Sequence, residues 1–195
     1  MKKLLLIAAF LLAGFWQYDQ NRVVEQADGV VAKAAPIQRH LKNARVFKHD
    51  GYSFTPLANF VIEARVLSRK KYSLDREAEL SPLDLALGWG PMSDNRVLDK
   101  IDISQGNHFY YWRVEQFPIP ENEIIRHSSN MHMIPANEQV ATQLAKVRKG
   151  SVVTITGQLV KINADDGWHW QSSLSRTDTG SGACELVWVK EVSLF

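Results

Sequence analysis

The sequence predicts an α+β protein that is mostly β: a small, curved antiparallel sheet or OB-like barrel with one packed helix at about residues 137–149. Segments with strand-like alternation, or with apolar residues on both faces, recur along residues 54–67, 108–116 and 151–194. The clearest helical spacing of apolar residues is confined to residues 137–149. An apolar helix at the N-terminus is expected to precede this domain.

Residues 1–18 are predicted to be a signal anchor or a signal peptide. They begin with two lysines and continue with an uninterrupted apolar run from Leu4 to Trp16. Because bulky residues follow the run, we favour an uncleaved anchor over a cleaved peptide. The expected partner of residues 4–16 is the membrane, with the domain anchored in the inner membrane and lying outside the cytoplasm. The alternative is a secreted or periplasmic domain after cleavage.

Residues 19–50 are polar with scattered apolar residues, which predicts a tether with one short helix from Ile37 to Phe47. A single β-rich globular domain is expected over residues 51–195. Its length and its apolar content are sufficient for a core of its own.

The first half of the domain should alternate strands and short helices. Residues 54–67 alternate apolar and polar side chains, as in a half-buried strand. Residues 81–88 begin with serine and proline and end with glycine, which predicts a short helix. Ser93 precedes a further possible helix start. Residues 108–116 carry aromatic residues on both faces, which predicts an interior strand or one with a binding face.

The second half should begin with the clearest helix and end in a cluster of strands. Asn137 is the expected N-cap of that helix and Gly150 its stop. Residues 151–162 then predict a strand with a bend at Gly157. The remaining predicted elements are a turn at residues 165–167 and strands at residues 168–174 and 184–192.

The charge of the chain disfavours one class of partner. Lysine and arginine total 23 against 21 acidic residues, which gives a net charge of +2 at pH 7. Nucleic-acid binding relies on many phosphate contacts by basic side chains, so we expect no nucleic-acid partner. The single cysteine cannot form an intramolecular disulfide.

Cys184 follows a polar run, residues 172–182, that is rich in serine and threonine. A catalytic thiol needs a histidine within hydrogen-bond reach, and the weak candidates are His132 and His169, with Asp178 as a third member. We favour a structural Cys184 at the start of the closing strand, because free cysteine is among the most buried residue types. The serines of the run match no nucleophile-elbow motif.

Five residues are candidates for ligand contact because of their aromatic or charged side chains. They are Trp89, Tyr110, Trp112, Arg176 and Asp178. An aromatic residue at a pocket rim can stack on a sugar or a peptide, and a guanidinium suits an anion. The alternatives are a buried indole for Trp89 and a purely loop-locking role for Arg176 and Asp178.

His127 and His132 are weak candidates for a metal site, with Glu123 as a third ligand. Their spacing of five matches no standard helical pair of zinc ligands. We therefore expect no metal and no cofactor.

Three segments, residues 86–94, 130–136 and 172–189, resemble those of a family of uncharacterised bacterial envelope proteins with a short N-terminal membrane segment. The resemblance covers most of the chain. It implies an envelope setting and carries no activity.

Together these features favour a membrane-tethered, non-catalytic envelope domain that binds a protein, peptide or glycan partner. The alternative is a hydrolase that uses residues 172–184 with His132 or His169. A cavity that brings Cys184 and a histidine within hydrogen-bond distance would favour the hydrolase.

Overall fold

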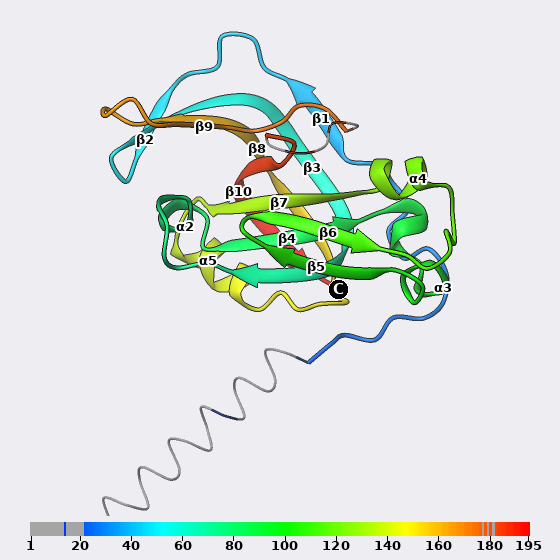
Figure 1. Cartoon of the computed structure of the whole chain (residues 1–195). Coiled ribbons are helices and arrows are strands. Elements are labelled where there is room, and N and C mark those ends of the chain that lie inside the picture. The colour runs from blue at the N-terminus through cyan, green and yellow to red at the C-terminus, as the bar shows by residue number, and fades with distance from the viewer. Residues whose placement is uncertain (1–13, 15–21, 177, 179, 181) are drawn as a thin grey trace, which may run out of the picture.

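The computed structural model describes residue 14, residues 22–176, residues 178 and 180, and residues 182–195. Most of the regular structure in this part of the chain is strand, in a curved sheet accompanied by a few short helices (Figure 1). The mostly β class is therefore confirmed. The apolar run at residues 4–16, apart from Gly14, lies outside the described residues. No helix in the described part is long and apolar enough to cross a membrane.

The main sheet contains eight strands. They are β1 (Ile37–His40), β2 (Phe47–His49), β3 (Tyr52–Lys71), β4 (Leu83–Gly88), β7 (Ser128–Pro135), β8 (Val152–Asn163), β9 (His169–Gln171) and β10 (Glu185–Leu194). A separate hairpin is formed by β5 (Asp102–Gly106) and β6 (Phe109–Arg113). The helices are α2 (Arg76–Leu80), η1 (Gly90–Ser93), α3 (Asn95–Leu98), α4 (Glu121–Arg126) and α5 (Glu138–Ala145), of which η1 is a 3-10 turn.

Five strands pair in a ring, which closes the sheet on itself. β3 pairs with β4 and with β8, β4 pairs with β7, and β10 joins β7 to β8. Only the β7–β10 pairing in this ring is parallel. β3 can pair on both sides because it is 20 residues long and bends between its two partners.

Apolar side chains fill the interior of the ring. They come from every strand of the ring and from one side of α5, including Phe60, Leu85, Met131, Val153 and Val187. Val140 and Leu144 of α5 belong to the same cluster, as the helical spacing predicts. Asn137 caps α5 by accepting a hydrogen bond from the Val140 amide at 2.9 Å.

The predicted helix at residues 81–88 is wrong, because Leu83–Gly88 forms strand β4. Every residue of β4 is buried, since the interior cluster covers one face and the β5–β6 hairpin covers the other. Leu83, Leu85 and Leu87 alternate as in a strand, but serine followed by proline resembles a helix start and favoured the helix. The expected helix at residues 37–47 is also wrong, since β1 and β2 occupy its two ends.

Residues 22–36, which the sequence places in the tether, lie along the domain in extended form. The Val24 amide donates to the Lys149 carbonyl at 2.8 Å, and the Gly90 amide donates to the Ala32 carbonyl at 2.8 Å. Ala32 is fully buried. Among the described residues, this stretch is therefore part of the packed structure.

Gly150 makes the contact between this N-terminal segment and the domain possible. Its φ is +87°, and a Cβ at this position would lie 2.0 Å from the Val24 carbonyl oxygen. We expect Gly150→Ala to lower the free energy of unfolding by about 2 kcal/mol, through backbone strain and loss of this contact. Urea unfolding measures this change in the free energy of unfolding.

Gly167→Ala is the matched control for this prediction. Gly167 has a φ of +90° but no atom within 4 Å of its would-be Cβ, so its substitution adds only backbone strain. An equal loss of stability in both variants would contradict a specific role for the Val24 contact.

Candidate functional site

A buried carboxylate and a buried imidazole face each other across neighbouring strands of the ring. Asp84 of β4 and His132 of β7 are direct cross-strand partners. Their side chains lie on the face opposite Leu83, Leu85 and Met131, which point into the interior cluster. Asp84 Oδ1 accepts a hydrogen bond from His132 Nδ1 at 2.8 Å. Asp84 is fully buried and His132 is 3% exposed.

The β5–β6 turn adds a second histidine to the same carboxylate. His108 Nδ1 lies 3.1 Å from Asp84 Oδ2, and its Nε2 lies 3.1 Å from Asp75 Oδ2. The ring of Tyr72 stacks on His108 with centroids 3.8 Å apart, and its hydroxyl accepts the His108 amide. Asn107 and His108 both have positive φ, which the tight turn requires.

The Cys184 thiol lies beside this pair of groups. It is close enough to His132 to raise the pKa of the imidazole, and its Sγ donates to the His108 carbonyl oxygen at 3.7 Å. Asn130 Nδ2 lies 3.8 Å from Cys184 Sγ and 3.0 Å from the His108 carbonyl oxygen. Gln105 fixes this amide by donating to Asn130 Oδ1 at 2.7 Å. Cysteine, histidine and aspartate thus lie near one another in the order of a nucleophile, a base and an orienting group.

The surroundings of His132 make it basic. Burial lowers the pKa of the imidazole, but the interactions with Asp84 and Cys184 outweigh it and raise the pKa to about 9. Trp170 covers the ring, with centroids 4.7 Å apart. In the pair with Cys184, an imidazole with this pKa carries the proton at pH 7, so the reactive pair is an imidazolium beside a thiolate.

The basicity of His132 predicts a pH dependence of folding. Its pKa in the folded state is about 9, above the ordinary value of about 6.5. Protonated His132 therefore contributes fully to the free energy of unfolding below about pH 6.5, and this contribution is lost as the pH rises through about 9. We expect the free energy of unfolding to fall across this window by up to about 1.4 kcal/mol per pH unit. Urea unfolding of the chain and of His132→Gln measures it, and an equal slope in the two would contradict the assignment.

Cys184 is partly exposed and lines a cavity of about 200 Å³ between the β5–β6 hairpin, β7 and the loop that precedes β10. The cavity is lined by aromatic and polar residues. Those that bear on its chemistry are Phe109, Tyr110, Trp112, Asn130, Asp178 and Cys184. The Tyr110 hydroxyl is held by Ser128 Oγ at 2.6 Å. The thiol is therefore accessible to a small molecule from the side opposite the buried carboxylate.

Three side chains of this site could hold a metal ion. One potential ligand atom from each of Asp84, His108 and His132 lies within 4.8 Å of the other two. Imidazole nitrogens and a carboxylate oxygen are suitable ligands for Zn²⁺. In this arrangement the same atoms make the hydrogen bonds described above.

The structure brings together several residues that the sequence singled out. Cys184, Tyr110, Trp112 and Asp178 line one cavity, and His132 lies behind the thiol. Cys184 is thus neither isolated nor fully buried, in contrast to the structural role that the sequence favours for it.

Other candidates lie elsewhere. Trp89 is a core residue with 2% exposure, as its alternative interpretation holds. His169 is an exposed residue of β9. His127 Nδ1 bonds the Glu123 carbonyl oxygen at 2.9 Å and lies 3.2 Å from the Glu123 carboxylate, while His132 is paired with Asp84. The proposed metal pair of His127 and His132 therefore does not share a ligand set.

Arg176 locks the loop that carries the thiol. Its guanidinium forms an ion pair with Glu185, which is 1% exposed, and donates to Gln38 Oε1 of β1. Ser173 Oγ donates to Asp178 Oδ2 at 2.5 Å, so Asp178 combines a loop contact with a place on the cavity wall.

Removal of Arg176 should leave a buried, uncompensated charge. We expect Arg176→Met to lower the free energy of unfolding by about 3 kcal/mol, because Glu185 would lose its ion-pair partner. In the double variant with Glu185→Gln the loss should be smaller, since no buried charge remains. Urea unfolding measures both, and a larger loss in the double variant would contradict the ion-pair explanation.

Asp84, His108, Asn130, Tyr72 and Asp75 were not predicted as site residues. Asp84 falls in a segment for which the sequence predicts a helix, His108 in a predicted strand, and Asn130 in a segment for which the sequence predicts no element. The available signal was chemical: residues 108, 130, 132 and 184 all carry potential donors, nucleophiles or bases. No spacing rule connects them, because strand pairing and a turn bring them together.

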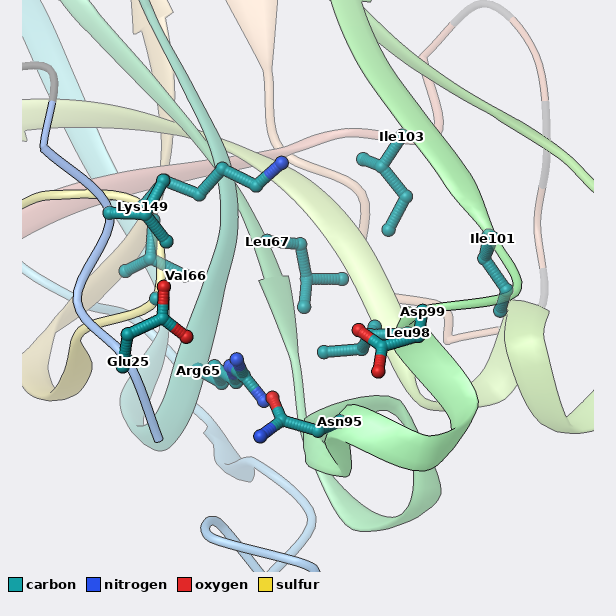
Figure 2. A pocket seen from close by; sticks show the side chains of 12 residues that line it. Glu25, Arg65, Val66, Leu67, Asn95, Leu98, Asp99, Ile101, Ile103 and Lys149 are labelled. Carbon is teal, nitrogen blue, oxygen red and sulfur yellow. The ribbon is translucent and has the colours of Figure 1, made fainter. Parts of the chain in front are cut away.

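A second cavity, of about 310 Å³, lies where the N-terminal segment meets β3 and α3. Glu25, Arg65, Asn95, Asp99 and Lys149 surround it (Figure 2). Arg65 is held by the Ser93 carbonyl at 3.2 Å and has acidic residues near it, which oppose the lowering of its pKa by burial. Charges of both signs are thus present, but no nucleophile or histidine lines this cavity among the described residues.

No protein-family model, curated protein or solved structure matches the chain.

Proposed function

We propose that the protein is a cysteine-dependent hydrolase in which Cys184 is the nucleophile, His132 the base and Asp84 the residue that orients His132. The supporting observation is the hydrogen bond from His132 to the fully buried Asp84 carboxylate, with Cys184 close enough to raise the pKa of His132 and lining a cavity. This is the alternative that the sequence left open, with His132 rather than His169 as the base and Asp84 rather than Asp178 as the acid.

The reaction that suits this arrangement is acyl transfer to water. His132 takes the thiol proton, and the thiolate attacks the carbonyl carbon of an ester or amide to form a carbon–sulfur bond. His132 then gives the proton to the leaving alcohol or amine as its bond to carbon breaks. In the second half, His132 deprotonates a water that attacks the thioester, which releases the acid and restores the thiol.

Asn130 is the candidate donor to the oxyanion of this reaction. Its Nδ2 lies 3.8 Å from Sγ, and its orientation is set by Gln105 and by the His108 carbonyl. A preorganised amide donor beside the nucleophile can stabilise the charge that develops on the carbonyl oxygen.

The cavity suggests a small acyl group as substrate. Its volume is about 200 Å³, and its aromatic walls favour a flat or apolar group over a long polymer. Asp178 at the wall disfavours an anionic acyl group, because like charges repel.

We also propose that the closed five-stranded ring is an OB-like barrel. The ring closure of β3, β4, β7, β10 and β8 supports this assignment. In that fold, ligands bind the face of the second and third strands and the loops beside it. Asp84 and His132 lie on those two strands of the ring, and Cys184 ends the loop before the last one.

The envelope setting stays part of the proposal. It rests on the apolar run at residues 4–16, which predicts a membrane anchor as the N-terminal partner of the domain. A topology reporter fused after Phe195 tests it, since activity of a reporter that works only in the cytoplasm would overturn it. A domain that only binds an envelope protein, peptide or glycan remains the competing prediction.

Trapping of the acyl intermediate distinguishes catalysis from binding. The full chain, purified in detergent, is mixed with p-nitrophenyl acetate, quenched in acid and analysed by intact mass and peptide mapping. We expect one acetyl group on Cys184. Acetylation confined to lysine residues, at the rate of the Cys184→Ala variant, would contradict the proposal.

A further inference from the structure

A cavity of about 420 Å³ lies between α5 and the ends of β3, β4 and β7. Its walls are mainly apolar, and Leu83, Met133 and Leu144 extend them into the interior cluster of the barrel. It shares no lining residue with the cavity at Cys184. The two are therefore separate sites.

One arginine in this wall lacks a compensating partner. Nε and Nη2 of Arg69 are buried without a hydrogen bond in the described structure. Burial lowers the pKa of this guanidinium, and no acidic residue is among the described residues that line the cavity. Lys71 also lies on the wall, so the charge at the cavity is positive.

Burial of a guanidinium without an anionic partner destabilises the folded state, because the group loses its hydrogen bonds with water and forms none in their place. Arg69 lines the cavity, so an anion bound there would lie beside this guanidinium. An anionic group there would offset the desolvation of the whole guanidinium, and charge-assisted hydrogen bonds of this kind are among the strongest in proteins.

We propose that this cavity binds a carboxylate with an apolar body, such as a medium-chain fatty acid, with the carboxylate on Arg69 and the chain against Leu83, Met133 and Leu144. The positive charge of the wall favours a ligand with an anionic group. The apolar lining favours a ligand with an apolar chain, because a small hydrated anion such as free phosphate would leave most of the cavity unfilled.

The test is isothermal titration of the full chain in detergent with sodium octanoate. Octanol has the same chain without charge, and acetate has the charge without the chain. We expect octanoate to bind at least about tenfold more tightly than either control, because octanol lacks the charge-assisted hydrogen bond and acetate lacks the apolar chain. Equal binding of octanoate and octanol, equal binding of octanoate and acetate, or no binding of octanoate would overturn the proposal.

Three variants assign the site. Arg69→Gln should weaken octanoate binding about tenfold or more and leave octanol unchanged. Lys190→Gln removes an exposed charge on β10 and should have no effect. Ala141→Phe keeps Arg69 but fills the cavity from α5, and should abolish binding of the chain. Full affinity in both Arg69→Gln and Ala141→Phe would place the ligand elsewhere and overturn the proposal.

Discussion

Replacement of His132 by alanine is expected to lower kcat/KM for ester hydrolysis at least about a thousandfold, because the nucleophile loses its base. His132 is the imidazole that bonds Asp84 and whose pKa is raised by the nearby Cys184. The measurement is hydrolysis of p-nitrophenyl acetate by the full chain over a range of substrate concentrations. Background hydrolysis by the Cys184→Ala variant is subtracted.

His169→Ala is the matched control for this result. His169 is exposed on β9, was an equal candidate in the sequence, and has no bond to the thiol in the described structure. Its substitution should leave kcat and KM unchanged. If it lowered the rate as much as His132→Ala, the assignment of the base would be wrong.

Substitution of Asp84 by asparagine is expected to lower kcat by about 10²–10⁴-fold with little change in KM. The amide is nearly the same size, but it can present a donor to His132 Nδ1 and favour the wrong tautomer of the ring. It also removes the charge that stabilises the imidazolium formed when His132 takes the thiol proton. A lower kcat with an unchanged KM would distinguish this role from a loss of substrate binding, which would raise KM.

Asp75→Asn provides the comparison for Asp84→Asn. Asp75 bonds the far nitrogen of His108 and the first turn of α2, so its substitution affects the surroundings without touching His132. A change of less than about threefold in kcat is expected, as for a group with no part in the chemistry. Equal losses in the two variants would show that Asp84 acts through general stability, and thermal unfolding of both proteins checks this.

Much of the fold could be predicted because the spacing of apolar residues along the sequence follows the pattern of burial. β3 and β8 alternate where one face meets solvent, and α5 has a capped apolar stripe. β4 was missed because Ser81 and Pro82 match a helix start, although Leu83, Leu85 and Leu87 alternate as in a strand. The strands at residues 37–49 carry few apolar residues and are held by pairing to β3, which the local sequence does not encode.

The site was predicted only in part, for a related reason. The residue types of His132 and Cys184 could be recognised, but their distance depends on β10 pairing in parallel with β7. Asp84 reaches His132 through the register of β4 on β7. His108 enters from a turn inserted between these strands. The strand register and the position of this turn depend on contacts between distant parts of the chain. A single sequence therefore shows which side chains could be reactive but does not show which of them lie close together.

The most direct test of the central claim is the rate at which iodoacetamide alkylates Cys184 in the native chain at about pH 7, compared between the unchanged protein and His132→Ala. Because the thiolate is the reactive form, the account predicts a rate at least about tenfold faster when His132 is present. His169→Ala should match the unchanged protein. The same rate with and without His132 would show that the histidine does not activate the thiol, and would contradict the account.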